Sequence, residues 1–98
     1  MLAITLSPKS RQDLIDIGDY IAKDSRTQAR LFMGKLKQQC QRIGTAPLAY
    51  PGRENLALGL RMAPIGNYVI FFRVMEGVIR IERVLQGSRD LSAIFSQG

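Results

Sequence analysis

The stretch of the chain that most restricts its fold is Gly59–Asp90, which has the pattern of three short antiparallel strands. Tyr68–Val74 and Val78–Leu85 are rich in β-branched and aromatic residues, and Met75–Gly77 between them has the composition of a hairpin turn. Arginine recurs through this stretch, at Arg61, Arg73, Arg80, Arg83 and Arg89. Sheet stability alone does not require so many guanidinium groups. We therefore expect a small sheet that presents arginines to an anionic partner.

The N-terminal part of the chain predicts a short strand followed by a helix. Leu2–Leu6 alternates weakly in hydropathy, as a strand with one buried face does. Ser7 is suited to the N-cap of a helix, and Pro8 to the first helical position, where its missing N–H costs nothing. The apolar residues that follow recur at helical spacing: Leu14, Ile17 and Ile21.

A second helix is predicted to begin after Ser25, because Gln28 stands at capping-box spacing from it. Its apolar residues form an almost unbroken helical stripe: Ala29, Phe32, Met33, Leu36, Cys40 and Ile43. Gly44 is expected to end this helix, and Pro47 follows shortly after it. Since the link between the two helices is short, we expect them to form an antiparallel hairpin.

The order of the predicted elements defines the fold class. Thr45–Leu58 is rich in Pro, Gly, Ala and Asn and predicts a loop, and Leu91–Gly98 predicts a tail with one helical turn. The order is therefore strand, helix, helix, strand, strand, strand. We expect a single α+β domain over residues 1–98, with an antiparallel helical hairpin packed on one face of a four-stranded sheet. The N-terminal strand joins the antiparallel meander by a crossover through the helices.

Alternation along the last predicted strand assigns its side chains to two faces. One set looks core-facing: Ile79, Ile81, Arg83 and Leu85. An arginine on an otherwise apolar face needs a partner, so we expect Arg83 to form an ion pair, with Glu54, Glu76 or Asp90. Arg80 is expected to pair with Glu82 on the other face. Gly87 after the strand permits a sharp turn that places Arg89 at the rim of the sheet.

The charge of the chain favours acidic partners. It carries 14 Lys and Arg against 8 Asp and Glu, a net charge of +6. Nucleic acid, an acidic protein and an anionic membrane surface all suit this balance, and so does a solvated basic surface without a specific partner. No apolar run approaches the roughly 18 residues of a membrane span, and the N-terminus does not resemble a secretory leader. We expect a cytoplasmic protein.

The counts of histidine and cysteine exclude several kinds of site. The chain has no histidine, which rules out histidine-based zinc sites, histidine general bases and histidine-activated nucleophiles. Cys40 is the only cysteine, so a disulfide framework is absent and the residue is expected to be a small core side chain. We expect no metal and no cofactor.

The chain resembles the ParE toxins of bacterial toxin–antitoxin modules, which belong to the wider RelE/ParE superfamily. The resemblance covers nearly the whole chain, and it rests on the order and spacing of several motifs together. The motifs are Tyr50–Arg53, Gly59–Arg61, Tyr68–Val74 and Arg83–Leu91, with Ser7, Pro8, Asp13, Leu14, Ile17, Tyr20, Ile21 and Ala29 in the N-terminal half. It implies the strand–helix–helix–three-strand fold that the residue pattern predicts.

The resemblance also implies partners and a mode of action. ParE toxins act on DNA gyrase, trapping it on cleaved DNA, and each is neutralised by a ParD-like antitoxin with a flexible acidic C-terminal segment. Such a toxin acts by protein–protein contact and is not an enzyme. A net charge of +6 suits an acidic partner through electrostatic steering. The residues expected to form the toxic surface are Arg61, Arg73, Arg83 and Arg89, with the Leu91–Phe95 tail and in particular Phe95.

RelE-type toxins of the same superfamily are the alternative, since they cut mRNA in the ribosomal A site. That chemistry needs basic side chains at the scissile phosphate and an acid–base residue. By resemblance, this chain has Leu60 and Met62 in place of lysines, Val69 in place of an arginine and Phe95 in place of a tyrosine, and it keeps Arg89. Valine cannot bind phosphate and phenylalanine has no proton to give, so the nuclease is disfavoured.

Two further interpretations stay open. The chain could be an inactive member of the family that serves only as a partner for its antitoxin, or an unrelated basic α+β domain. Gln86 stands where the family often has histidine, and glutamine keeps a hydrogen-bonding group but does not titrate near neutral pH. This departure does not weaken the ParE interpretation, because ParE toxins are not nucleases.

Overall fold

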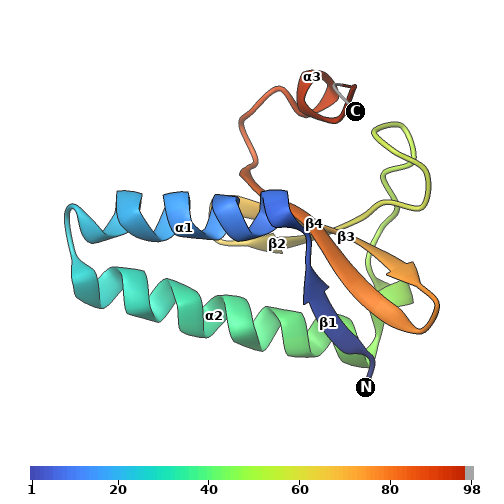
Figure 1. Cartoon of the computed structure of the whole chain (residues 1–98), viewed down its shortest axis with the longest axis horizontal. Helices are drawn as coiled ribbons and strands as arrows, with labels where there is room; N and C mark the ends of the chain where they lie inside the picture. The colour runs from blue at the N-terminus through green and yellow to red at the C-terminus, as the bar shows by residue number, and fades with distance from the viewer. Residues whose placement is uncertain (97–98) are drawn as a thin grey trace.

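The computed structural model describes residues 1–96 and has the element order predicted from the sequence (Figure 1). The helical turn predicted in the C-terminal tail is present as a short helix, and a 3₁₀ turn follows the second helix. The elements are β1 (Ala3–Leu6), α1 (Pro8–Ala22), α2 (Arg26–Thr45), the 3₁₀ turn η1 (Pro47–Ala49), β2 (Arg61–Ile65), β3 (Tyr68–Met75), β4 (Val78–Gln86) and α3 (Leu91–Ser96). The α+β class and the β-α-α-β-β-β order are confirmed. The last two residues of the predicted Leu91–Gly98 tail lie outside the described residues.

Both predicted helix starts are confirmed. The Ser7 hydroxyl accepts a hydrogen bond from the Ser10 N–H at 3.0 Å, and the Ser25 hydroxyl accepts one from the Gln28 N–H at 3.1 Å. Each bond satisfies one of the N–H groups that the first turn of a helix leaves without a partner.

The predicted end of α2 at Gly44 is wrong, because the helix continues to Thr45. Gly44 is buried where the segment before β1 meets the helix: the Leu2 N–H donates to the Gly44 carbonyl at 2.9 Å. A Cβ atom at Gly44 would lie 3.1 Å from the Leu2 carbonyl oxygen. The glycine therefore serves a close approach of two backbones, and not a left-handed cap.

The four strands form one sheet in the order β1-β4-β3-β2. β1 runs parallel to β4, and β2, β3 and β4 form the predicted antiparallel meander. The turn between β3 and β4 has both central residues in the left-handed region, Glu76 at φ 53° and Gly77 at φ 77°. This is the conformation of a type I′ hairpin turn, and it confirms the turn predicted at Met75–Gly77.

A β-bulge in β4 changes which face its residues occupy. Phe72 pairs with Ile81, whereas the preceding Phe71 pairs with Arg83, so Glu82 is an extra residue in β4. After the bulge the alternation is reversed. Val84 joins the cluster of Ile79 and Ile81 beneath the helices, while Leu85 packs on the opposite face. The prediction that Arg83 and Leu85 share a face with Ile79 and Ile81 is therefore wrong.

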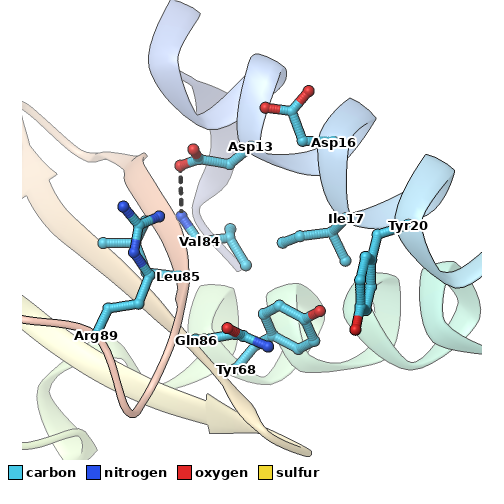
Figure 2. A pocket seen from close by; sticks show the side chains of 9 residues that line it. All are labelled: Asp13, Asp16, Ile17, Tyr20, Tyr68, Val84, Leu85, Gln86 and Arg89. Carbon is cyan, nitrogen blue, oxygen red and sulfur yellow. Dashed lines mark hydrogen bonds between the residues drawn. The ribbon is translucent and has the colours of Figure 1, made fainter.

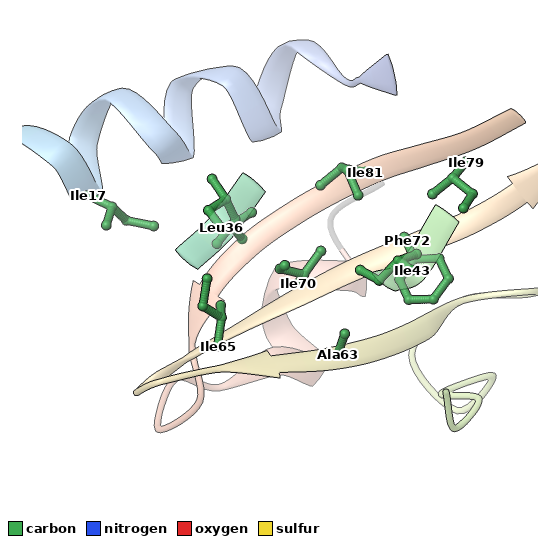
Figure 3. Packing of buried hydrophobic residues seen from close by; sticks show 10 residues of the cluster. Ile17, Leu36, Ile43, Ala63, Ile65, Ile70, Phe72, Ile79 and Ile81 are labelled. Carbon is green, nitrogen blue, oxygen red and sulfur yellow. The ribbon is translucent and has the colours of Figure 1, made fainter. Parts of the chain in front are cut away.

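Each face of the sheet buries its own apolar cluster. The larger cluster lies between the sheet and the α1–α2 hairpin, as predicted, and includes Ile17, Leu36, Ile43, Ile70 and Phe72 (Figure 3). Cys40 packs against this cluster as expected, and burial raises the pKa of its thiol. The smaller cluster, on the other face, contains Leu60, Phe71 and Leu85 and is covered by Leu91, Ile94 and Phe95 of α3. Figure 1 shows α3 standing apart from the α1–α2 hairpin.

Within residues 1–96 no helix has the length and hydrophobicity needed to cross a bilayer.

Candidate functional site

The structure brings three of the five predicted surface residues together and places the other two elsewhere. Arg73, Arg83 and Phe95 line one groove, beside the N-terminus of α1. Arg89 lines a second groove, along the middle of α1. Arg61 lies on β2, where its side chain contacts the loop that precedes the strand.

The first groove, which we call the arginine groove, has a volume of about 470 Å³. Its walls are the start of α1, the arginines of β3 and β4, and the apolar side chains of α3. The charged side chains that line it are Lys9, Arg73, Arg80, Arg83 and Glu82, and Ile94 and Phe95 form its apolar wall. Lys9 is not among the site residues predicted from the sequence. Lys9 lies beside the arginines only because the fold places the N-terminus of α1 next to β4.

Arg73 and Arg80 are directly opposite one another on β3 and β4 and share one carboxylate. The Arg80 Nε donates to Glu82 Oε1 at 2.8 Å, which confirms the pair predicted between these two residues. The Arg73 Nε lies 3.3 Å from Glu82 Oε2 but is buried without a hydrogen-bond partner among residues 1–96. The two guanidinium groups are therefore only partly neutralised.

Arg83 is held by α1. Its Nε and Nη2 donate to the two carboxylate oxygens of Asp13, both at 2.8 Å, and the hydrogen bonds raise the pKa of Arg83. The expected ion pair exists, but the expected partners, Glu54, Glu76 and Asp90, are wrong. Asp13 Oδ2 also accepts from the Val84 N–H at 3.0 Å. Beyond the end of β1, the Asp13 carboxylate of α1 thus satisfies one backbone N–H at the edge of β4.

The second groove, which we call the tyrosine groove, has a volume of about 340 Å³ and lies between α1 and the ends of β3 and β4 (Figure 2). Tyr20, 64% exposed, and Tyr68 line it together with Asp16, Gln86 and Arg89. Arg89 follows β4 at the rim of the sheet, where the sequence placed it, and its side chain is exposed. Figure 2 shows Arg89 beside Leu85 and on the far side of Tyr68 from Tyr20.

Arg61 anchors the long loop before β2. Its Nη1 donates to the Tyr50 carbonyl oxygen at 2.7 Å, and the backbones of Gly52 and Arg61 form an isolated bridge. Arg53 also fixes this loop against β2, since its backbone N–H donates to the Leu60 carbonyl at 2.6 Å. The side chain of Arg61 therefore has a structural contact as well as partial exposure.

Four residues that depart from the RelE-type pattern all pack in the smaller apolar cluster. Leu60 is fully buried there, and Met62, Val69 and Phe95 pack against it or its neighbours Phe71 and Leu85. The Phe71 and Phe95 rings meet edge to face, with centroids 5.0 Å apart. Within residues 1–96, the one polar contact of these four side chains is that of the Met62 sulfur, which accepts a hydrogen bond from Arg53 Nη1 at 3.2 Å. No three His, Cys, Asp or Glu side chains of residues 1–96 gather into a group that could hold a metal ion.

Comparison with known proteins gives the family. The family model described as "ParE toxin of type II toxin-antitoxin system, parDE" matches residues 4–91. The chain therefore belongs to the ParE toxin family of type II toxin–antitoxin systems, and the resemblance read from its motifs is confirmed.

A solved structure, described as a chromosomal ParDE TA system from P. aeruginosa, shares the fold. It superposes with a TM-score of 0.73 at 21% sequence identity, covering 88% of this chain and 96% of that chain. Comparison with curated protein sequences gave no significant match.

Proposed function

We propose that this protein is a growth-inhibiting toxin that poisons DNA gyrase and is neutralised by a ParD-like antitoxin. The observation that carries the proposal is the match of the ParE family model to residues 4–91, which spans every element from β1 to the start of α3. The toxin acts by protein–protein contact and catalyses no reaction of its own. The packing of Leu60, Met62, Val69 and Phe95 supports this part of the proposal, since none of these side chains can bind a phosphate or transfer a proton.

The antitoxin is the expected acidic partner. The net charge of +6 favours association with an acidic polypeptide. In the part of the chain that the structure describes, four basic side chains and one acidic side chain line the arginine groove. A solved relative, described as a ParDE TA system, supports a partner of this kind.

The toxic surface that we propose consists of Arg61, Arg73, Arg83, Arg89 and Phe95. Arg89 offers the cleanest test, because it is exposed and its side chain makes no hydrogen bond or ion pair within residues 1–96. Arg61 and Arg83 have structural partners, so their removal also perturbs the loop before β2 and the packing of α1. Variants of these two residues need a stability measurement beside every toxicity measurement.

Purified gyrase tests the proposal directly. Supercoiling and DNA-cleavage assays are run with the protein alone and with the antitoxin encoded beside it. Accumulated cleaved DNA, suppressed by the antitoxin, is the expected result. If gyrase is unaffected and mRNA is cut at codon positions after induction, the gyrase proposal is wrong and the RelE-type alternative is supported. Unaffected gyrase without mRNA cuts or growth arrest would indicate a member of the family without toxicity.

A further inference from the structure

The arginine groove has features that sheet stability does not explain. Arg73 and Arg80 are directly opposite on neighbouring strands, and like charges in this position destabilise a sheet. Of the described residues, Glu82 is the one acidic side chain lining the groove, and it is close to both guanidinium groups. Glu82 is also the extra residue of the β-bulge. Bulges commonly redirect side chains next to functional sites.

The guanidinium groups of Arg73 and Arg80 have N–H donors that no acceptor among residues 1–96 satisfies. The Arg73 Nε is buried without a hydrogen-bond partner among residues 1–96, and the Arg73 side chain makes no other hydrogen bond within this part of the chain. Among residues 1–96, Arg80 donates only through Nε, to Glu82. The terminal amino groups of both arginines thus remain available, and their side chains are 34% and 43% exposed. An incoming oxyanion would satisfy them.

The start of α1 adds positive potential to the same groove. Ser7, Pro8 and Lys9 form one wall, and the first turn of this 15-residue helix contains no acidic residue. The N-terminus of a helix carries a partial positive charge, which Lys9 reinforces. Asp13 does not offset this potential, because both of its oxygens bind Arg83.

We propose that the arginine groove binds an acidic peptide segment of a partner protein, with one carboxylate seated between Arg73 and Arg80. The apolar wall formed by Ile94 and Phe95 takes an apolar side chain next to that carboxylate. The proposal extends the proposed function, because an acidic antitoxin segment is one such peptide. Its test uses neither gyrase nor antitoxin, so the two proposals can fail separately.

A peptide fits this surface better than a nucleic acid does. A nucleic-acid backbone carries closely spaced charges and needs cations along its whole path. Here four cations converge on one groove: Lys9, Arg73, Arg80 and Arg83. After the exposed Arg11, α1 continues away from it with Asp16 and Asp19, both exposed. A polyanion that followed the helix would meet these carboxylates, whereas a short acidic and apolar segment would not.

Peptide binding by the purified protein tests the proposal. The probe is a fluorescein-labelled heptapeptide of Glu and Leu, with its Gln and Leu counterpart and an oligothymidylate of similar charge as comparisons. We expect the Glu-containing peptide alone to bind and to shift the Nε–Hε NMR resonances of Arg73 and Arg80. Arg73→Gln and Arg80→Gln should each weaken this binding by about tenfold, since each removes a charge-assisted hydrogen bond.

Arg30→Gln is the matched control, because Arg30 is an exposed arginine of α2 and does not line the groove. It should leave the affinity almost unchanged. The groove variants should melt at or above the wild-type temperature, because each removes one of two opposed charges. Equal weakening by all three substitutions would show general charge attraction and overturn the proposal. Absence of peptide binding, or preference for the oligothymidylate, would overturn it as well.

Discussion

At the scale of single residues, the arginines of this protein divide by what their side chains already bind. Arg83 has a bidentate partner in Asp13, and Arg61 donates to the backbone of Tyr50. Arg73 and Arg80 compete for Glu82, and Arg89 is exposed at the rim of the tyrosine groove. The first two stabilise the fold. Within residues 1–96 the other three side chains make no comparable contact with a loop backbone or with α1, and we expect binding to a partner to depend most on them.

Asp13 is expected to be the acidic residue on which stability depends most. It is 11% exposed, holds Arg83 with both oxygens and satisfies the Val84 N–H. Asp13→Ala leaves a largely buried guanidinium and a backbone donor without partners. We expect the free energy of unfolding to fall by about 2–3 kcal/mol, measured by urea denaturation. Asp19→Ala, an exposed position on the same helix, should change it by less than about 0.5 kcal/mol. Similar losses in both variants would contradict the role assigned to Asp13.

A second prediction at this scale concerns the shared carboxylate. Glu82→Gln leaves Arg73 and Arg80 opposed without an anion between them. Both arginines are partly exposed, so the expected loss of stability is modest, about 1 kcal/mol at low salt. Salt screens the remaining repulsion, since the Debye length shrinks to about 3 Å at 1 M. The difference between variant and wild type should therefore shrink as NaCl is added to the urea titration. Glu54→Gln, exposed in the loop, serves as control, and a salt-independent difference would show that repulsion is not its cause.

At the scale of elements, α2 contains two glycines whose replacement should have opposite effects. A Cβ at Gly34 would meet nothing within 4 Å, whereas one at Gly44 would lie 3.1 Å from the Leu2 carbonyl oxygen. Gly34→Ala should raise the free energy of unfolding by about 0.5–1 kcal/mol, because alanine favours the helix. Gly44→Ala should lower it by about 1–3 kcal/mol, because backbone atoms of the N-terminal segment must shift. Thermal and urea unfolding of the two variants measure both effects, and stabilisation by Gly44→Ala would contradict the close approach inferred here.

The elements show which parts of the fold a sequence can predict. Helix starts are local, since Ser7 and Ser25 each bond a backbone N–H three residues ahead. They were therefore predicted correctly. The prediction that Gly44 caps α2 is wrong, because the sequence does not distinguish a glycine that ends a helix from one that allows a neighbouring backbone to approach. Only the position of Leu2 distinguishes them.

The candidate site was harder to predict, because it depends on contacts between distant parts of the chain. The bulge at Glu82 appears only when β3 and β4 are paired, and it moves Arg83 to the other face of the sheet. Asp13 then binds Arg83 across 70 residues of sequence. Composition and resemblance suggest candidate arginines, but not which of them share a groove.

At the scale of the whole molecule, α1 separates two surfaces. The arginine groove lies at its N-terminus and the tyrosine groove along its middle. Asp13 lines the tyrosine groove, and its partner Arg83 lines the arginine groove. Their ion pair therefore lies between the two grooves. Arg73, Arg83 and Phe95 of the proposed toxic surface line the arginine groove, whereas Arg89 lines the tyrosine groove. A contact made through Arg89 can therefore be lost while binding of an acidic partner in the arginine groove is kept.

Arg89→Ala tests whether the two surfaces are independent. Arg89 lines the tyrosine groove and is not among the described residues that line the arginine groove. Its exposed side chain is expected to contribute little to stability. We expect this substitution to abolish growth inhibition on induction while the melting temperature and the affinity for the Glu and Leu peptide stay almost unchanged. Arg80→Gln is the complementary variant and should lose peptide affinity by about tenfold. If Arg89→Ala remains fully toxic, Arg89 does not belong to the toxic surface. If it instead weakens peptide binding as much as Arg80→Gln does, the two grooves act as one site, and a partner that binds there must span both sides of α1.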